Sequence, residues 1–151
     1  PAQEHMASLL IKHAIICSIN ELPAPVSTQP PIVLFMPDEE HHEIPLLFIH
    51  FMLKKNGHSV LYFGGNQAEK AVASYCQRHA RGLMHYHFIT NFTRFDSQEY
   101  LENWCRQFPQ WRIVVSGSGV QQLGVVPANT TILKSMLHLQ LHCRQPLKEQ
   151  A

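Results

Sequence analysis

The sequence predicts an α/β fold of the flavodoxin-like (Rossmann-like) class, a five-stranded parallel sheet with an N-terminal helical segment. Short apolar runs alternate about five times with helical patterns, and parallel strands need such crossover connections. The first run, Ile32–Phe35, is wholly apolar and lies between Pro31 and Pro37, which is typical of a strand covered on both faces. The length of 151 residues suits a single domain with a full core.

The N-terminal half contains two helical patterns and two strands. Residues 1–22 have the three-and-four spacing of a helix, with an apolar stripe formed by Met6, Leu9, Leu10, His13, Ile16 and Cys17. Residues 22–31 are rich in proline, which lacks an amide donor, and this predicts a linker. After the first strand, Glu43–Lys55 has buried-face helical spacing and closes at Asn56-Gly57. Val60–Phe63 is the second predicted strand.

The C-terminal half continues the alternation. Three more strands are expected, over Leu83–Phe88, Ile113–Val115 and Thr131–Leu133. Three more helices are expected, over Gln67–His79, over Ser97–Phe108 with Ser97 as N-cap, and from about Lys134. The predicted domain borders are therefore 1–21 for a helical segment, 22–31 for a linker and 32–147 for the Rossmann-like domain.

The composition is that of a globular chain. It is 45% hydrophobic and 15% charged, with a net charge of +1, which is too balanced for this segment to bind nucleic acid by itself. No apolar stretch approaches the length of a membrane span, and no secretory signal is present. The cysteines form no C-x-x-C pair, so neither a zinc knuckle nor a redox dithiol is indicated. We expect a cytoplasmic protein with reduced cysteines and no membrane partner.

Histidine is unusually frequent, with eleven residues. In open parallel sheets ligands bind beyond the carboxyl ends of the strands, near the point where the strand order reverses. Three loops fall at that edge: DEEHHEIP after the first strand, HYHFITNFT after the third and SGSG after the fourth. Four histidines lie in or beside these loops, at positions 41, 42, 85 and 87. The edge is therefore the predicted binding site.

The first of these loops has two interpretations. In Glu40-x-His42 the carboxylate can reach the imidazole two residues on, which fixes the tautomer and directs the far nitrogen toward a metal. Alternatively, Asp38, Glu39 and Glu43 only favour the start of the following helix through its dipole. The Ser-Gly-Ser-Gly turn suits close approach of a bulky ligand or binding of an anionic group.

A string of residues in this region resembles a known family. PDEEHHEIPLLFIHFMLKKNGHSVLYFGGN is similar to the opening of a cobalamin-binding Rossmann-like domain, whose motif is D/E-x-H-x-x-G followed by a helix, a glycine and a strand ending in a "yLG" pattern. Glu40, His42, Gly57 and Tyr62-Phe63-Gly64 occupy the corresponding places. The best match within that superfamily is the effector domain of light-sensing MerR-type transcription regulators of the CarH/LitR type.

The opening PAQEHMAS resembles the end of a W-x9-E-H motif, which in these regulators belongs to a helical cap. Here Glu4 and His5 match its last two residues, and the tryptophan would fall before Pro1. The resemblance therefore implies that residues 1–21 are the end of the cap subdomain. We expect the chain to be the C-terminal part of a longer protein whose DNA-binding part precedes it.

The resemblance assigns roles to particular residues. It implies that His42 is the lower axial ligand of the cobalt and Glu40 its hydrogen-bond partner. It places Glu4 and His5 over the upper face of the corrin. Ser116, Gly117 and Ser118 would flank the nucleotide tail. In this sequence Tyr86 or His87 stands where the family has a small serine, and Pro45 replaces the motif glycine.

The function implied is sensory and not enzymatic. Cobalamin, as adenosylcobalamin or another form, and light would control homo-oligomerisation, and DNA would be bound only by the absent N-terminal domain. A second hypothesis is a cobalamin-free oligomerisation or protein-interaction module of the same fold, its pocket filled by His85, Tyr86 and His87. A third is a metal-dependent hydrolase that uses residues 40–43. Methyl transfer by a corrinoid carrier is disfavoured by the cap motif.

Overall fold

The computed structural model describes residues 2–26, 28–38, 40–65, 68–89 and 96–145. Its elements in chain order are α1 (Ala2–Glu21), β1 (Ile32–Phe35), α2 (Glu43–Lys55), β2 (Val60–Gly64), α3 (Ala68–Gln77), β3 (Gly82–His87), α4 (Ser97–Gln107), β4 (Trp111–Ser116), η1 (Ser118–Gln122), β5 (Thr130–Leu133) and α5 (Met136–Arg144). The bounds of β1 and α2 are those predicted, and the other elements from β2 to α5 differ at their ends by one or two residues. Three predicted ends, Pro1, Gln67 and residue 147, lie outside the described residues.

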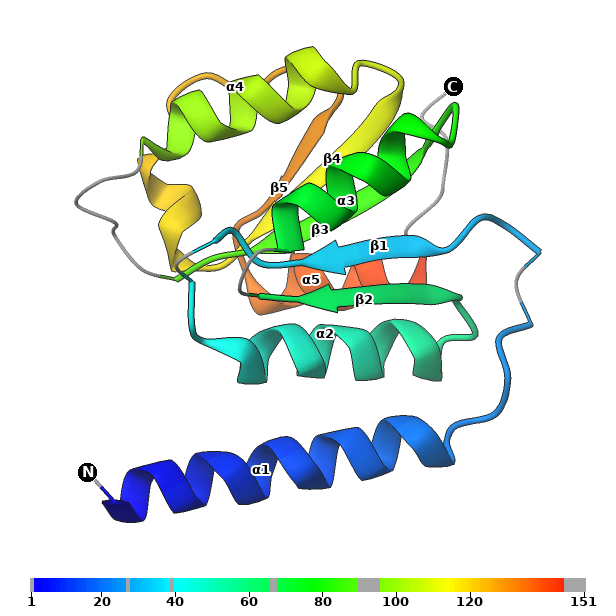
Figure 1. Cartoon of the computed structure of the whole chain (residues 1–151), viewed down its shortest axis with the longest axis vertical. Coiled ribbons are helices and arrows are strands. Elements are labelled where there is room, and N and C mark those ends of the chain that lie inside the picture. Colours follow the sequence, from blue (N-terminus) through cyan, green and yellow to red (C-terminus); the bar gives the residue numbers. More distant parts are fainter. Residues whose placement is uncertain (1, 27, 39, 66–67, 90–95, 146–151) are drawn as a thin grey trace.

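The five strands form one parallel sheet in the order β2-β1-β3-β4-β5. This is the flavodoxin-like order, and the predicted fold class is confirmed. The order reverses between β1 and β3, so the chain leaves these two neighbouring strands in opposite directions across the sheet (Figure 1). The carboxyl ends of β1 and β3 therefore enclose the position where such folds bind ligands.

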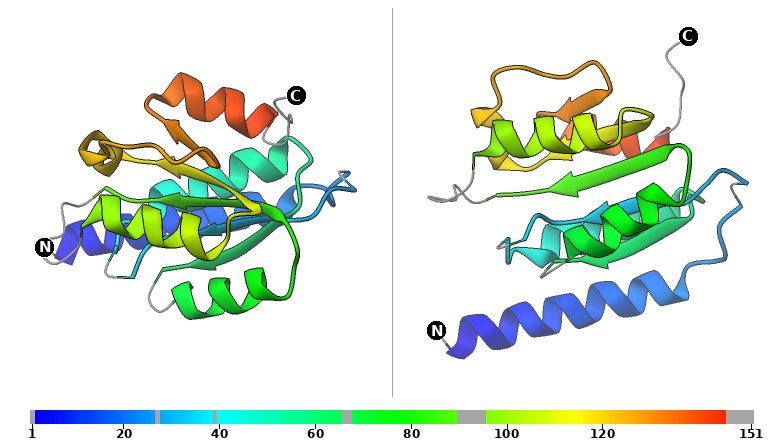
Figure 2. Two further views of the ribbon diagram at one scale, coloured as in Figure 1. Left: turned by 90° about the horizontal axis from the view of Figure 1, so that it is seen from above. Right: turned by 45° about the horizontal axis from the view of Figure 1, so that its top comes forward.

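Helices cover both faces of the sheet (Figure 2). α3 and α4 pack on one face, against the alternate side chains Val33, Phe35, Met84, Tyr86 and Phe88. α2 and α5 pack on the other face, against Ile32, Leu34, Met36, Leu83 and Val114. All four residues of β1 are buried, as the proline-bounded apolar run predicted. No helix among the described residues is both long and apolar enough to cross a membrane.

Two helix starts differ from the sequence prediction. The N-cap of α4 is Asp96 and not Ser97, because an Asp96 carboxylate oxygen accepts from the amides of Gln98 at 2.8 Å and Glu99 at 3.1 Å. The final helix begins at Met136 and not near Lys134, because Ser135 caps it. In both cases a short polar side chain in extended backbone sets the first turn.

α1 packs on α2, on the side away from the sheet (Figure 1). Lys12 forms an ion pair with Glu43 at 2.9 Å, and Lys54 donates to the carbonyl oxygen of Ile19 at 2.8 Å. The apolar stripe recognised in the sequence does not make this contact: Met6, Leu9, Leu10, His13, Ile16 and Cys17 are all exposed. The least exposed side chains of α1 are instead those of Ser8, Lys12, Ile15 and Ile19.

Candidate functional site

The loop after β1 is organised by the side chain of Glu40, which is fully buried. One carboxylate oxygen, Oε1, accepts from the backbone amides of His41 and His42, each at 2.9 Å. The other, Oε2, accepts at 2.7 Å from the amide of Ile89, which follows β3. Glu40 therefore ties together the two loops that meet where the strand order reverses. The hydrogen bonds to these amides offset the cost of removing the charge from water.

His42 is the exposed partner of this carboxylate. Its Nδ1 lies 2.6 Å from Oε1 of Glu40, so the contact expected from the Glu40-x-His42 spacing is present. The side chain of His42 is 55% exposed. A carboxylate at Nδ1 favours the tautomer with a proton on Nδ1, which places the lone pair of the ring on Nε2. The loop therefore presents an oriented imidazole of the kind that ligates metals.

A hydrogen-bonded trio of side chains adjoins this pair. The hydroxyl oxygen of Ser116, at the end of β4, lies 2.8 Å from Nε2 of His85 and 2.8 Å from Nδ1 of His87. Burial lowers the pKa of His87 to about 4, although nearby Glu40 acts to raise it. Burial, with smaller contributions from His142 and His87, holds the pKa of His85 well below 6.5. Both histidines are therefore neutral at pH 7.

An open cavity of about 240 Å³ lies beside this trio. Four candidate residues from the sequence line it together: His87, Ser116, Gly117 and Ser118. The start of α5 closes the opposite side. Nε2 of His87 is buried and has no hydrogen-bond partner among the described atoms. Buried polar atoms are normally hydrogen-bonded, so this nitrogen is an unsatisfied group of a residue that lines the cavity.

The glycines of the Ser-Gly-Ser-Gly turn have a different role from the one expected. Gly117 has φ +107°, in the left-handed region that favours glycine. A Cβ at Gly117 would overlap the carbonyl oxygen of Phe88, and a Cβ at Gly119 would overlap the Phe88 ring. The absence of a side chain at Gly117 and Gly119 thus leaves room for Phe88 of the same chain. It does not by itself leave room for a ligand.

Tyr86 does not fill the cavity. It is fully buried on the α3 and α4 face, where its ring lies 5.8 Å from that of Phe35 and 5.9 Å from that of Phe88. The hypothesis of a pocket filled by His85, Tyr86 and His87 is therefore wrong for Tyr86. The two histidines are on the opposite face, because side chains alternate along a strand.

The remaining candidates are less closely joined to the site. Glu4 and His5 are exposed in the first turns of α1, the end of the helix that lies on the same side as the carboxyl ends of β1 and β2 (Figure 1). Among the described residues, no hydrogen bond or ion pair is made by the side chain of His5. The structure therefore brings together Glu40, His42, His87 and the turn after β4, but not the two residues of α1.

Glu43 has a structural role that the sequence did not reveal. Its carboxylate accepts from Lys12 of α1 and, at 2.9 Å, from the hydroxyl of Tyr62 in β2. Burial, followed by the charge of Glu43, raises the pKa of Tyr62. Glu43 thus binds α1 and β2 to the start of α2, which is more than the dipole interaction considered for it.

A protein metal centre at residues 40–43 receives no support from this geometry. Within the described ranges, no group of three or more His, Cys, Asp and Glu side chains is placed to hold a metal ion. Glu40 is enclosed by donors, and Glu43 is engaged by Lys12 and Tyr62. The arrangement suits a single histidine ligand to a metal that brings its other ligands with it.

Fold and site together define a class of domain: a flavodoxin-like sheet with a histidine–carboxylate pair where the strand order reverses. No protein-family model matches the chain. The chain is 26% identical over 121 residues to the HTH-type transcriptional repressor CarA of Myxococcus xanthus. The match covers 80% of this chain but only 42% of that protein, so the chain spans less than half of the relative. It is a distant relative of that regulator.

Two members of the site could not be found from the sequence. The amide of Ile89 binds Glu40 from 49 positions away, and His142 of α5 places its ring 5.2 Å from that of His85 in a T-shaped contact. Neither has a local pattern that points to the site. The sequence did give one signal for this face of the sheet. His85 and His87 are two positions apart in β3, so their side chains lie on the same face.

Proposed function

We propose that this chain is a sensory domain of a transcription regulator and that it binds cobalamin, with His42 as the lower ligand of the cobalt. The observation that carries the proposal is the Glu40–His42 pair, with 2.6 Å between Oε1 and Nδ1, at the edge where this fold binds ligands. The distant relationship to a transcriptional repressor supports the regulatory part of the proposal.

The residues present fit the cobalt side of such a ligand. His42 is exposed and oriented, and its carboxylate partner is buried and held by three backbone amides. Such an outer partner raises the basicity of a ligating imidazole and fixes its orientation. Pro45, in place of the motif glycine, lies in the first turn of α2, where its missing amide proton costs no helical hydrogen bond.

The residues also offer a place for the nucleotide tail, though a small one. The cavity beside Ser116, Gly117 and Ser118 has a volume of about 240 Å³, and His87, which lines it, has a buried nitrogen, Nε2, without a partner in the described structure. His85 lies deeper and is fully buried against His142, so a ring entering between the sheet and α5 must stop at His87. In this proposal His87 donates or accepts a hydrogen bond at the inner end of the tail.

When bound, the corrin would supply a cobalt centre whose upper ligand can be exchanged or released by light. The part of this chain would be to hold the cobalt through His42, whose ring is oriented by Glu40. A ligand acts on association only through its differential affinity for the monomeric and oligomeric states. We propose that this difference controls a homo-oligomer, while DNA is bound by a domain outside this chain.

The test is retention of the cofactor by the purified chain. Hydroxocobalamin or adenosylcobalamin is added in the dark, the sample is desalted, and the visible spectrum and elution volume are recorded before and after illumination. A retained corrin with a histidine-ligated spectrum is expected. We expect His42→Ala to abolish that ligation and Glu40→Gln to weaken affinity about 10- to 100-fold, the usual effect of losing an outer-shell partner.

His41→Ala is the matched control. His41 is adjacent, exposed and joined to Glu40 only through its backbone amide, so its side chain can be removed without altering the loop. The control should retain the corrin unchanged. A colourless wild-type protein, or a His42→Ala protein with the wild-type spectrum, would refute the assignment. Circular dichroism of each variant separates loss of ligation from loss of the fold.

The exposed apolar face of α1 favours a second candidate function, a protein-association module without cofactor. Met6 and Leu10 are more than 60% exposed, and Leu9 and Ile16 extend the same surface. Water-exposed apolar surface of this kind is typical of an interface. Light scattering of the chain without cobalamin, compared with that of a Leu9→Glu, Leu10→Glu variant, tests whether this face drives association by itself.

A further inference from the structure

α2 and α5 lie next to each other on one face of the sheet and are in contact (Figure 2). An open groove of about 370 Å³ lies between these two helices. The lining from α2 includes Phe48, Phe51, Met52 and Lys55, and the lining from α5 includes Gln140 and Arg144. None of the described residues of this lining belongs to a strand of the sheet. The groove is therefore a feature of the outer helical layer.

The α2 side of the groove is apolar and partly open to water. Phe48 is 40% exposed, although it is a large aromatic residue. Its ring stacks with that of Phe51, with 6.5 Å between the ring centroids. On α5, Leu141 is 52% exposed and lies three positions before Arg144, so the two side chains are neighbours on the helix surface. Large apolar side chains that gather at an exposed groove are typical of a protein interface.

Two cations lie at one end of this groove. Lys55 and Arg144 are exposed residues in the last turns of α2 and α5. Neither forms an ion pair with another described residue, and no described residue of the lining is acidic. Nζ of Lys55 is 5.7 Å from the ring centroid of Phe51, so the charge directly adjoins the apolar surface. The dipoles of the two helix ends offset roughly half a charge each, and this end of the groove stays positive.

We propose that this groove binds an acidic amphipathic helix of a partner protein. The apolar stripe of such a helix would contact Phe48, Phe51 and Met52, because a stripe at three-and-four spacing fits a groove between two helices. Its carboxylates would lie beside Lys55 and Arg144. Charge complementarity of this kind sets the partner and the orientation in which it binds. The groove contains none of the residues assigned to cobalamin.

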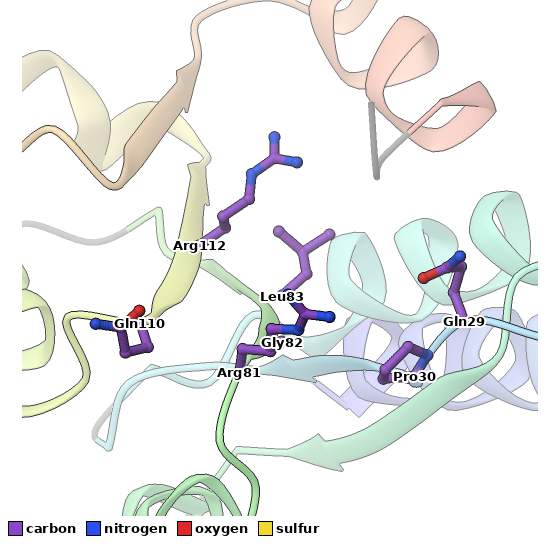
Figure 3. A pocket seen from close by; sticks show the side chains of 7 residues that line it. All are labelled: Gln29, Pro30, Arg81, Gly82, Leu83, Gln110 and Arg112. Carbon is purple, nitrogen blue, oxygen red and sulfur yellow. The ribbon is translucent and has the colours of Figure 1, made fainter. Parts of the chain in front are cut away.

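The pocket at the amino edge of the sheet is separate from this groove and supplies a control residue. Figure 3 shows this pocket at the starts of β3 and β4, with Arg81 and Leu83 in its lining. Arg81 is exposed, and no described residue of α2 or α5 lines that pocket. A change of Arg81 therefore removes a cation from the chain without altering the groove.

The test is selection from a displayed library of amphipathic helices whose apolar stripe is fixed and whose polar positions are random. The target is the whole chain at pH 7.5. The selected helices should be rich in aspartate and glutamate. Their affinity, measured by fluorescence anisotropy, should fall as the salt concentration is raised, because exposed ion pairs are screened. Selection of basic helices, or of helices without any preference in charge, would overturn the proposal.

The variants locate the bound helix on the chain. Phe48→Ala should weaken binding of a selected helix about tenfold or more, because a few aromatic side chains dominate such interfaces. Lys55→Gln and Arg144→Gln should each weaken it about two- to fivefold, the usual effect of an exposed ion pair. Leu10→Ala on α1 and Arg81→Gln are the matched controls, an exposed apolar residue and an exposed cation outside the groove. Wild-type affinity in Phe48→Ala would overturn the proposal.

Two other occupants of the groove are tested in parallel. Light scattering over a concentration series compares self-association of the wild type and of Phe48→Ala, and sedimentation with phosphatidylglycerol vesicles compares their binding to a lipid surface. The proposal expects Phe48→Ala to change neither result. Loss of self-association in Phe48→Ala would assign the groove to a second copy, and loss of vesicle binding would assign it to a membrane. Either loss, without an effect on the selected helix, would overturn the proposal.

Discussion

The two faces of the sheet are built from different chemistry. Under α3 and α4 the core is aromatic, with Phe35, Tyr86, Phe88, Trp104, Phe108 and Trp111 in contact. Under α2 and α5 the core is aliphatic, and it carries a row of polar side chains formed by His85, His87, Ser116 and His142. One face is a closed packing surface, whereas the other keeps neutral histidines away from water.

The two faces also differ in the buried polar groups that they contain. A buried polar group costs free energy unless it is hydrogen-bonded. On the histidine face, Nδ1 of His85 and Nε2 of both His87 and His142 are buried without partners in the described structure. On the aromatic face of the described structure, the hydroxyl of Tyr86 is such an atom. Both faces therefore contain buried polar atoms without a partner in the described structure, but the unsatisfied ring nitrogens lie on the histidine face, where His87 lines the cavity.

Lowering the pH should give the largest effect, a loss of stability that comes from the histidine face. The folded-state pKa values of His87 and His142 are lowered to about 4, and that of His85 lies well below 6.5. The unfolded chain therefore binds more protons than the folded chain between pH 6.5 and 4. Stability should be complete above pH 6.5 and should fall by about 1.4 kcal/mol per pH unit for each histidine as the pH decreases.

Urea unfolding at pH 7.5, 6 and 5 measures this slope. His142→Gln should reduce it by up to one proton, and His138→Gln, at an exposed position of the same helix, is the matched control. Equal free energies of unfolding at pH 7.5 and pH 5 would show that the three histidines are not held neutral by the fold.

The aromatic face should respond most to loss of a ring. The indole of Trp104 lies 5.2 Å from the ring of Phe35 and 5.4 Å from that of Phe108, and the residue is only 6% exposed. Trp104→Ala should lower the free energy of unfolding by about 3–5 kcal/mol, because it leaves a cavity in a packed core. Leu137→Ala, on the outside of α5, should change it little. A loss below about 1 kcal/mol for Trp104→Ala would mean that the core collapses around the gap.

Removing one hydroxyl from the histidine face should have a smaller but clear effect. Ser116→Ala takes away the hydrogen-bond partner that His85 and His87 share. We expect a loss of about 1–3 kcal/mol, the usual cost of leaving buried polar groups unpaired. Ser118→Ala is the control, because that residue is exposed and, among the described residues, its hydroxyl donates to the carbonyl oxygen of Ile89. Equal stability of the two variants would argue against the bridging role of Ser116.

Removing one hydroxyl from the aromatic face should have the opposite sign. The hydroxyl of Tyr86 is buried and has no partner in the described structure. Tyr86→Phe should therefore be neutral, or stabilising by up to about 1 kcal/mol, since it removes an unsatisfied polar group at constant shape. Chemical denaturation of Tyr86→Phe beside Ser116→Ala gives the comparison directly. A clear destabilisation would reveal a partner for this hydroxyl.

The fold class could be predicted from the sequence because it follows from local patterns. The apolar run Ile32–Phe35 and the helical spacing of Glu43–Lys55 each fix an element, and alternation with right-handed crossovers leaves few sheet topologies. The face of α1 that contacts α2 could not be predicted from the sequence. This helix has apolar residues on several sides, so periodicity does not indicate whether Ile15 and Ile19 or Leu9 and Leu10 pack against α2.

Part of the candidate site could be predicted from the sequence for the same reason. Glu40 and His42 are two residues apart, so their contact follows from local geometry. The bonds from Ile89 to Glu40 and from His85 to Ser116 join positions 49 and 31 residues apart, and they depend on strand register. The N-cap of α4 shows a different limit. Asp96 and Ser97 are neighbours and both suit the N-cap position, so the sequence does not distinguish between helix starts that differ by one residue.

The Ser116 hydroxyl has a single proton, and this limits how its two histidines can be arranged. The oxygen can donate to one ring nitrogen only, so the other nitrogen must donate to it. If Ser116 donates to His87, Nε2 of that neutral ring carries a proton and is a hydrogen-bond donor. If Ser116 donates to His85, Nε2 of His87 becomes an acceptor. The tautomer of the deeply buried His85 therefore sets whether Nε2 of His87, a residue that lines the cavity, carries a proton or a lone pair.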